Sequence, residues 1–508
     1  MLIFAADTKL RLMKRTSSLY LITECLVLLA AFTSCWQDRS GEYYALIGSK
    51  SWIYTTMQDY YLYYQDLPSE DELDFFQKPA EFLNTAASEK DGKDGILYSH
   101  IDSVKTTATR SLSDSPTFGF EAVMLQTPQG EYALQVLYTQ PQSPAEEAGL
   151  KRGDLIIGAD SVKISSSDYT KYVISPTAAH LFTLGIYNAE TEQIDTIGTV
   201  QMPVPRVIEI QNLLKTSLIN TGNRKAAYIL YNEFGEDEIP QWQSLYSQLA
   251  AAQPDDIILD LRYNPGGYVS TAQVVGTLLA PQSALGQTML TMTGNDKLNL
   301  TETYTFDTDL LPGGSTLSYQ NLYVITSGNT ASASEIIINC LRPYMTGNLY
   351  QVGEATFGKN VAQALYTNDQ YPQLEFWLTT YYLSNSDGYK DYDVEGLPAD
   401  YTQSEPYGGN LGELGTDTDP LMYPILVRMA TGSFPTAETA TRTLASPRML
   451  VVKNSVAEKR KTARTNLSFQ SLPDFLPGNW NKVPSFRSLN QINVYLCSPK
   501  TREKKDEP

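Results

Sequence analysis

Hydroxyl side chains are concentrated in one turn of the sequence, within the segment LYVITSGNTASASEIIINC at residues 322–340. The run LYVIT is typical of a buried strand and EIIINC of a helix, so the polar residues between them are expected at a helix N-terminus. The unpaired N–H groups and the positive dipole end found there favour a developing negative charge, as acyl transfer requires. Four residues of this turn carry a hydroxyl group: Ser327, Thr330, Ser332 and Ser334.

Ser332 has two possible roles in this turn. With Glu335 it has the S-x-x-E spacing of a capping box, in which the serine does no more than begin a helix. The chain has no G-x-S-x-G elbow and no S-x-x-K motif near a suitable helix. Its two histidines, His100 and His180, both lie in the N-terminal half. A catalytic serine here would therefore need a base other than histidine.

Lys359 is the candidate base, in the segment VGEATFGKNVAQALY at residues 352–366. A lysine amine acts as a general base when burial lowers its pKa from about 10.4 towards roughly 7–8. In an extended strand Lys359 and Gln363 would point to one face, and Gln363 could accept a hydrogen bond from the amine. Taken alone, Lys359 would more often be an exposed loop lysine.

The elements that must position these residues alternate between strands and helices after Pro205. The expected order is a strand at 225–234, a helix at 240–253, a strand and glycine turn at 255–267, and a helix at 269–281. Such alternation indicates an α/β core. The polar stretch 282–320 is expected to be a hairpin or insertion. Upstream, residues 36–112 carry aromatic residues and leucines at helical spacing, which predicts a small helical region.

Between these regions the sequence changes to short strands. FGFEAVML and EYALQVLYT are separated by the turn TPQG, and SPAEEAGLKRGD then leads into LIIGA. This segment resembles the second half of a PDZ domain, and FGFEA is similar to the PDZ loop whose backbone amides hold a peptide's terminal carboxylate. The resemblance implies peptide binding by strand addition next to Phe118, Gly119 and Phe120.

Three motifs that follow this segment in the sequence show a second resemblance. LDLRYNPGG, TASASE and TFGKNVAQ, in this order, resemble the carboxyl-terminal processing (tail-specific) proteases of the S41 serine peptidase family. The likeness covers about residues 40–430, and this variant is similar to the lipoprotein branch found in Bacteroides-type bacteria. Many relatives have an acidic QD pair where this chain has LRPYMTGN, so no role of that acid carries over.

The resemblance implies a Ser/Lys mechanism at residues of this chain. Ser332, the first serine of TASASE, would be the nucleophile, and Lys359 the general base. Gln363 would support the lysine. The backbone amides of Ala333 and of Gly267, the last glycine of NPGG, would form the oxyanion hole. No metal or cofactor is needed for this chemistry.

The expected fold is multidomain α+β, with an N-terminal helical cap, a PDZ-like β domain and an α/β peptidase core of the ClpP/crotonase-like type. A strand is still expected at 448–452, but residues 446–508 carry 12 Lys and Arg against 5 Asp and Glu without apolar periodicity. The expected segments are a signal peptide at 1–35, a helical domain at 36–112, a PDZ domain at 113–204, an S41 catalytic core at 205–432 and a largely disordered C-terminal extension at 433–508.

Composition excludes several other classes of protein. The net charge of −19 argues against nucleic acid, because its phosphates would be repelled. Four cysteines without CxxC spacing and two isolated histidines indicate neither a metal site nor a disulfide framework.

The first residues indicate export from the cytoplasm. A basic flank at 9–15 precedes the apolar run LYLITECLVLLAAF, which is short for a membrane span and suits a signal peptide, with the start at Met1 or Met13. The run ends in FTSC, which resembles a bacterial lipobox with Cys35 as the lipidated residue. A plain secretory signal with an incidental cysteine is the alternative. Both place the mature protein in the cell envelope, with a membrane anchor only if Cys35 is lipidated.

The sequence thus predicts an exported endopeptidase that captures C-terminal segments of proteins through its PDZ domain and cleaves them in the α/β core. One alternative is a PDZ-bearing binding or scaffold lipoprotein without catalysis. A second is a Ser/Lys hydrolase that acts on non-peptide esters or amides.

Overall fold

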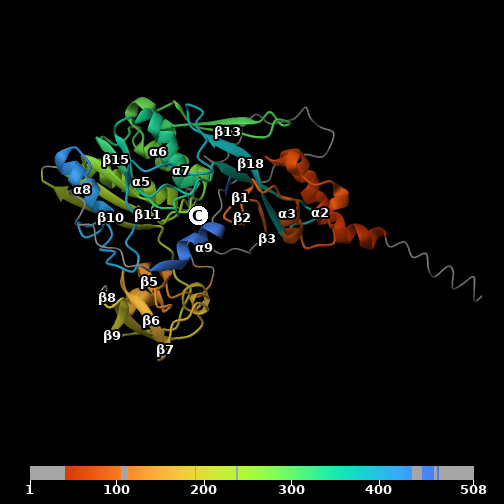
Figure 1. Ribbon diagram of the computed structural model, residues 1–508. Helices are drawn as coiled ribbons and strands as arrows, with labels where there is room; N and C mark the ends of the chain where they lie inside the picture. Colours follow the sequence, from red (N-terminus) through yellow and green to blue (C-terminus); the bar gives the residue numbers. More distant parts are fainter. Residues whose placement is uncertain are drawn as a thin grey trace, which may run out of the picture. The chain divides into compact units, whose positions relative to one another are not determined.

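The structure is a computed structural model that describes residues 40–103, 113, 115–188, 190–222, 224–235, 238–436, 449–462 and 466–467. These residues have a mixed α+β fold with several sheets (Figure 1). The predicted signal peptide and Cys35 lie outside the described residues. Within the described ranges, no helix combines the length and the hydropathy needed to cross a membrane.

The N-terminal region contains helices, as predicted, and also short strands. Its apolar core is formed by Ile53, Met57, Phe82 and neighbouring residues, which pack on Phe376 of a later strand. Figure 1 shows α2 and α3 beside β3 and β18. The purely helical expectation was wrong for residues 92–103, because these residues pair as strands and β3 adds to β18. The elements are α2 (Ser40–Tyr60), η1 (Tyr64–Asp66), η2 (Glu70–Glu72), α3 (Pro79–Ala86), β1 (Gly92–Lys93), β2 (Ile96–Leu97) and β3 (His100–Ser103).

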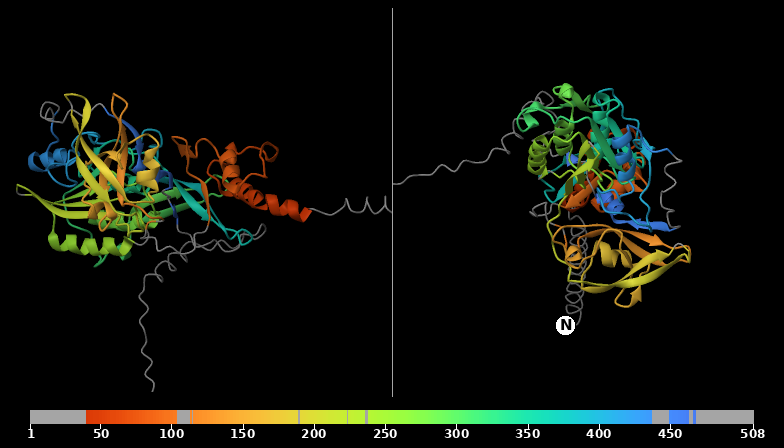
Figure 2. Two further views of the ribbon diagram at one scale, coloured as in Figure 1. Left: turned by 90° about the horizontal axis from the view of Figure 1, so that it is seen from below. Right: turned by 90° about the vertical axis from the view of Figure 1, so that its left-hand side faces the viewer.

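A seven-stranded sheet follows, with the order β20-β4-β5-β6-β8-β9 and β7 paired to β6. Figure 2 shows its strands β4 to β9, coloured orange to yellow, gathered together. The two strands and the intervening turn predicted at FGFEAVML and EYALQVLYT are confirmed as β4 and β5. The elements are β4 (Phe120–Gln126), β5 (Tyr132–Thr139), α4 (Pro144–Glu147), β6 (Leu155–Ala159), β7 (Val162–Lys163), η3 (Thr170–Ile174), β8 (His180–Asn188) and β9 (Gln193–Met202).

The edge of this sheet is occupied by a segment from the far end of the chain. Strand β20 (Leu450–Asn454) pairs antiparallel with β4, close to the strand predicted at 448–452. Helix α9 (Ser455–Thr462) follows, so the expectation of an irregular tail was wrong for these residues. The physical reason is tertiary: Val456 is buried in the core, and Ser455 Oγ accepts a 2.9 Å hydrogen bond from the Ala122 amide.

A second sheet has the order β10-β11-β12-β15-β16-β19, parallel except for β10. Its central strands are almost wholly buried, as the continuous apolar runs of a parallel sheet require. Figure 1 shows α5, α6 and α7 gathered over these strands. The predicted strand–helix alternation is confirmed. The elements are β10 (Leu213–Thr221), β11 (Arg224–Tyr231), α5 (Ile239–Ala252), β12 (Asp256–Asp260), α6 (Val269–Leu279), β15 (Asn321–Thr326), α7 (Ala333–Leu341), η7 (Arg342–Tyr344), β16 (Leu349–Gly353), β19 (Tyr401–Thr402) and α8 (Met422–Thr431).

A third sheet has the order β14-β13-β18-β17-β21, with β3 also paired to β18. The predicted hairpin in 282–320 is confirmed by the antiparallel pair β13 and β14. This sheet connects the N-terminal region to the segment that carries Lys359. Its elements, with the short helices around them, are η5 (Gln282–Ala284), β13 (Thr288–Thr293), β14 (Thr301–Thr305), η6 (Thr308–Leu310), β17 (Val361–Tyr366), β18 (Leu374–Ser384) and β21 (Asn466–Leu467).

Candidate active site

Ser332 occupies the turn between β15 and α7, where it is the N-cap of the helix. Its side chain is buried, and its backbone has φ 59° and ψ −113°. A non-glycine residue in this region costs about 1–3 kcal/mol, and such strain is concentrated at active sites. The predicted capping box with Glu335 is confirmed, and the Ser332 amide donates to Glu335 Oε2 at 2.6 Å. The strained backbone had no signature in the sequence.

The NPGG turn at residues 264–267 lies directly against Ser332. A Cβ added to Gly266 would come within 2.7 Å of Ser332 Cβ, so only glycine fits there. Asn264 holds the two turns together, because its backbone carbonyl oxygen accepts hydrogen bonds from the Ala331 amide and from Ser334 Oγ, each at 3.2 Å. Two segments about 65 residues apart in the sequence are thus brought to one place.

The other three hydroxyl groups of the turn have structural roles. Ser327 Oγ donates to the Arg262 carbonyl at 2.5 Å, and Thr330 Oγ1 donates to the Leu261 carbonyl at 2.8 Å. Ser334 Oγ bonds the NPGG turn as described. These contacts leave Ser332 as the candidate nucleophile.

The two predicted oxyanion-hole amides belong to these two turns. Ala333 is the first residue of α7, so its N–H is among those that have no acceptor within the helix. Gly267 forms an isolated β-bridge with Phe234. In this bridge the Phe234 amide donates to the Gly266 carbonyl and the Tyr268 amide donates to the Phe234 carbonyl, so the Gly267 amide takes no part. A Cβ on Gly267 would lie 2.3 Å from the Phe234 carbonyl oxygen.

Lys359 is buried, with 6% of its surface exposed, so the exposed-lysine alternative does not hold. Burial lowers the pKa of Lys359 to about 8, although the negative charges of Asp91 and Glu335 act in the opposite direction. The Lys359 amine lies 5.0 Å from the centre of the Tyr98 ring. The amine is therefore partly neutral near pH 8, which is the state that a general base requires.

Glu335 connects the serine to the lysine. Its Oε2 accepts from the Ser332 amide at 2.6 Å and from the Lys359 amide at 2.8 Å, so both backbones meet at one oxygen. Its Oε1 accepts from Thr356 Oγ1 and from the Gly358 amide, each at 2.6 Å. Burial raises the pKa of Glu335, while these four donors favour its carboxylate. The sequence identified Glu335 only as a helix cap, because the residues it joins are distant in the chain.

Gln363 is also buried. Lys359 precedes β17, and the pairing of β17 with β18 shifts between Ala362 and Gln363, so regular two-residue alternation does not by itself place the two side chains on one face. Gln363 Nε2 donates to Thr379 Oγ1 at 3.1 Å, whereas its buried Oε1 has no partner among the described residues.

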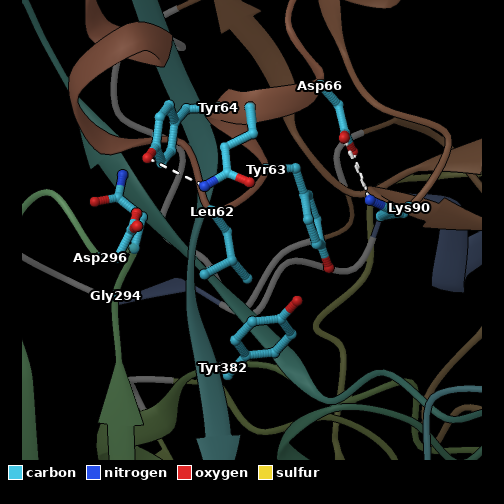
Figure 3. Close-up of a pocket in the computed structure, with 10 residues that line it drawn as sticks. Leu62, Tyr63, Tyr64, Asp66, Lys90, Gly294, Asp296 and Tyr382 are labelled. Atoms are coloured by element: carbon cyan, nitrogen blue, oxygen red, sulfur yellow. Dashed lines mark hydrogen bonds and ion pairs between the residues drawn. The ribbon is translucent and has the colours of Figure 1, made fainter.

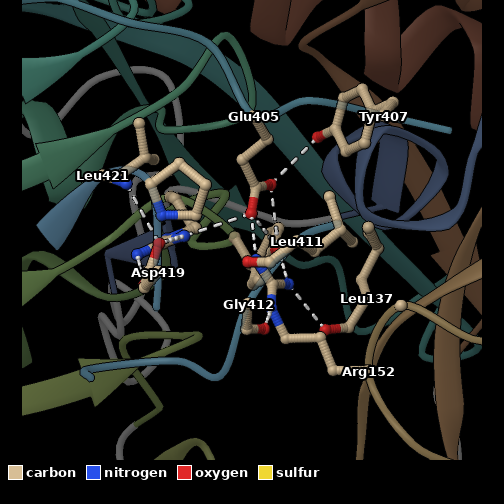
Figure 4. A network of polar contacts seen from close by, with 12 residues as sticks. Leu137, Arg152, Glu405, Tyr407, Leu411, Gly412, Asp419 and Leu421 are labelled. Carbon is tan, nitrogen blue, oxygen red and sulfur yellow. Dashed lines mark hydrogen bonds and ion pairs between the residues drawn. The ribbon is translucent and has the colours of Figure 1, made fainter. Parts of the chain in front are cut away.

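A buried ion network supports the strand that leads into the NPGG turn (Figure 4). The Arg262 guanidinium, fully buried, bonds Asp260 (2.9 Å), Asp419 (2.6 Å) and Glu405 (3.1 Å). Arg152, which follows α4, adds a 2.5 Å contact to Glu405. Burial opposes ionisation of Glu405, but the two arginine charges outweigh it and lower the pKa of Glu405 to about 2. Glu405 is therefore ionised at physiological pH, and the contacts of Arg262 hold the chain at the start of the turn.

The predicted peptide-binding residues lie at the start of β4: Phe118 and Gly119 precede the strand, and Phe120 is its first residue. The side chains of Phe118 and Phe120 are buried in the core of the seven-stranded sheet, so only their backbone can meet a ligand. Gly119 has φ 77°, and its amide donates to Thr117 Oγ1 at 3.0 Å. The edge of β4 that follows this loop is paired with β20.

A surface pocket lies next to the N-terminal region and is not lined by any predicted site residue (Figure 3). The Tyr63 and Tyr382 side chains face it, and the ion pair of Lys90 with Asp66 (2.9 Å) lies at its rim. It is separate from the serine and lysine turns.

A serine at a helix N-terminus together with a buried lysine of lowered pKa fits a serine hydrolase in which lysine replaces histidine as the base. Comparison with known proteins identifies the family within this class. Residues 225–402 match the model of peptidase family S41, and residues 48–100 match the peptidase S41 N-terminal domain. The chain belongs to peptidase family S41.

Individual relatives agree with this assignment. A carboxyl-terminal-processing protease of Picosynechococcus is 26% identical over 59% of this chain and 67% of its own length. The carboxy-terminal processing protease CtpB of Bacillus subtilis is 22% identical over 59% of this chain and 61% of its own length. The chain thus spans about two thirds of the length of these relatives. A Bacteroides fragilis protein assigned to the S41 proteases has a crystal structure that matches with a TM-score of 0.65 and 28% identity, over 75% of this chain and 97% of that chain.

Proposed function

We propose that this protein is a serine endopeptidase of the carboxyl-terminal processing type that cleaves protein substrates with Ser332 and Lys359. The observation that carries the proposal is the Glu335 carboxylate, because one oxygen binds both the Ser332 and Lys359 amides while Lys359 is buried with a lowered pKa. A binding scaffold without catalysis would gain nothing from a buried lysine, because burial of its charge lowers the stability of the fold. The family's curated members named above are processing proteases.

The proposed reaction has two halves. In the first, Lys359 Nζ takes the proton of Ser332 Oγ as this oxygen bonds to the substrate carbonyl carbon. The amides of Ala333 and Gly267 stabilise the resulting oxyanion, each donor being worth on the order of 10²–10³ in rate. The C–N bond then breaks, and the Lys359 ammonium protonates the leaving amine. In the second half, water attacks the acyl-enzyme with Lys359 again as base and releases the carboxylic acid and Ser332.

Substrate capture by a PDZ domain formed by the seven-stranded sheet belongs to the proposal. A peptide that adds a strand to β4 needs the edge now paired with β20, so binding requires β20 to leave. The exposed side chains of β20, with Leu450 65% and Val451 39% exposed, keep the cost of its release low. Export, and lipidation at Cys35 as a membrane anchor, are supported only by the sequence pattern of the first 35 residues.

The catalytic part is tested with the purified full chain and an unfolded protein substrate. Ser332→Ala and Lys359→Met should each abolish cleavage, whereas the exposed lysine change Lys163→Met should leave it intact. Equal cleavage by all variants contradicts the proposal. If none of them, nor the unaltered chain, cleaves any protein but all bind peptides, the chain is a binding protein.

The capture part is tested by peptide binding. Val451→Pro removes a backbone donor from β20 and should increase affinity for a fluorescent peptide with a free C-terminal carboxylate, while Val451→Thr should not. An amidated peptide is the control for carboxylate recognition. If Val451→Pro and Val451→Thr bind this peptide equally, β4 is not the binding edge.

A further inference from the structure

Asp91 is a buried carboxylate that the N-terminal region places beside the lysine. It lies between α3 and the short strand β1, and none of its surface is exposed. Its two oxygens accept hydrogen bonds from Thr379 Oγ1 at 2.5 Å and from Tyr61 Oη at 3.0 Å. The mechanism described above does not use it.

The hydrogen bonds that join Asp91, Thr379 and Gln363 can run in only one direction. A carboxylate has no hydrogen to donate, so the single hydroxyl hydrogen of Thr379 must point to Asp91. Thr379 Oγ1 can then only accept from Gln363, which agrees with the 3.1 Å contact to Gln363 Nε2. Because the amide nitrogen of Gln363 faces Thr379, its carbonyl oxygen must face the other way. That oxygen is buried and has no partner among the described residues.

Asp91 is held in the ionised form that this direction requires. Ser99 adds a third hydroxyl donor to Asp91, and Ser99 Oγ in turn accepts from the Thr379 amide at 2.9 Å. Burial raises the pKa of Asp91 to about 6 against these three donors. Asp91 is therefore mainly a carboxylate above pH 6.

Asp91 acts on the charge of the Lys359 amine, and Thr379 joins Asp91 to Gln363. The Lys359 amine lies over the ring of Tyr98, whose own amide donates to the Asp91 carbonyl at 2.9 Å. The charged groups that act on this amine are Asp91, from the N-terminal region, and Glu335, from α7. A buried amine needs an acceptor to orient it, and the unpaired carbonyl oxygen of Gln363 is one.

We propose that Asp91 and Thr379 are positioning residues, which form a one-way hydrogen-bond relay that presents the Gln363 carbonyl oxygen to the Lys359 amine. The relay rests on the proposed Ser/Lys function and gives the N-terminal region a part in the active site. When the Lys359 amine bonds this oxygen, one of its hydrogens is fixed on Gln363 and its lone pair can face Ser332.

The test is the rate at which a neutral fluorophosphonate labels Ser332 in the full chain, measured from pH 6 to 10. Thr379→Val removes the hydroxyl at nearly constant volume and should lower the plateau rate at least about tenfold, in line with general-base contributions. Thr379→Ser restores the hydroxyl and should restore the rate. Thr380→Val is the matched control, because the Thr380 hydroxyl is buried in the same strand but donates to the Leu378 carbonyl.

Asp91→Asn gives an independent readout. Loss of the negative charge should move the midpoint of the pH–rate curve down by about one unit, because the charge of Asp91 raises the pKa of the amine. A merely structural role would reduce the amount of folded protein and leave the midpoint of the remaining labelled fraction unchanged. An unshifted midpoint together with wild-type rates in Thr379→Val overturns the relay.

Lys359→Met separates this proposal from the proposed function. If Lys359→Met labels as fast as the unaltered chain, the Ser/Lys mechanism itself fails. If Lys359→Met is inactive while Thr379→Val and Asp91→Asn behave as the unaltered chain, only the relay fails.

Discussion

The lowered pKa of Lys359 predicts how activity depends on pH. The pKa falls from 10.5 to about 8 because the amine is buried, against the opposing charges of Asp91 and Glu335. At pH 7, about 10% of the amine is then neutral, compared with about 0.03% for an unshifted lysine. Burial therefore increases the population of the active base about 300-fold at pH 7.

The lowered pKa of Lys359 also means that its burial destabilises the folded chain at low pH. The unfolded chain binds a proton at this lysine up to its ordinary pKa, whereas the folded chain loses it near pH 8. Burial of the ammonium thus costs about 3 kcal/mol below pH 8, and the cost fades as the pH rises towards the ordinary value. Lys359→Met should be inactive and yet raise the free energy of unfolding at pH 7 by up to about 3 kcal/mol.

The assay is hydrolysis of a neutral peptide, with kcat/KM followed from pH 6 to 10, together with urea unfolding of Lys359→Met at pH 7. The rate should rise about tenfold per unit below pH 8 and level off above it. Lys359→Arg should show no such rise of the rate with pH, because a guanidinium stays protonated. If kcat/KM of the unaltered chain does not rise with pH, or rises with a midpoint above pH 10, the argument that burial makes Lys359 the base is refuted.

Three further outcomes follow from the turns around Ser332. Ser332→Gly should be more stable than Ser332→Ala by about 1 kcal/mol in thermal unfolding, because glycine tolerates φ 59° and alanine does not. Gly266→Ala should abolish peptide hydrolysis, since the added Cβ meets Ser332 Cβ at 2.7 Å. Gly130→Ala should keep it, because Gly130 also has a positive φ but its added Cβ would meet only Gln126 Nε2, at 4.0 Å. Glu335→Gln should lower the free energy of unfolding by about 2–5 kcal/mol, because the amide hydrogens of glutamine must face buried N–H or O–H donors. Equal stability of Glu335→Gln and the unaltered chain would mean that the carboxylate is protonated.

Much of the fold could be predicted from local patterns. The apolar runs at 225–234, 255–260 and 322–326 and the helical periods between them predicted β11, β12, β15 and the α/β alternation, because strand and helix periods are properties of the local chain. The short strands β1 to β3 and helix α9 were missed. Their residues gain order from distant partners, β18 for β3 and the core around Val456 for α9.

For the site, the sequence alone determined which residue types were available: a serine at a helix start, a lysine as the candidate base in place of histidine, and a glycine turn. The tertiary structure decided the surroundings of each of them. Burial lowers the pKa of Lys359, the turn strains Ser332, and Glu335 joins the two through a single oxygen. Asp91 reaches the same place from more than 260 residues away in the chain. The reason is physical, since pKa values, strain and hydrogen-bond direction depend on what surrounds a group, and those surroundings come from segments that only folding brings together.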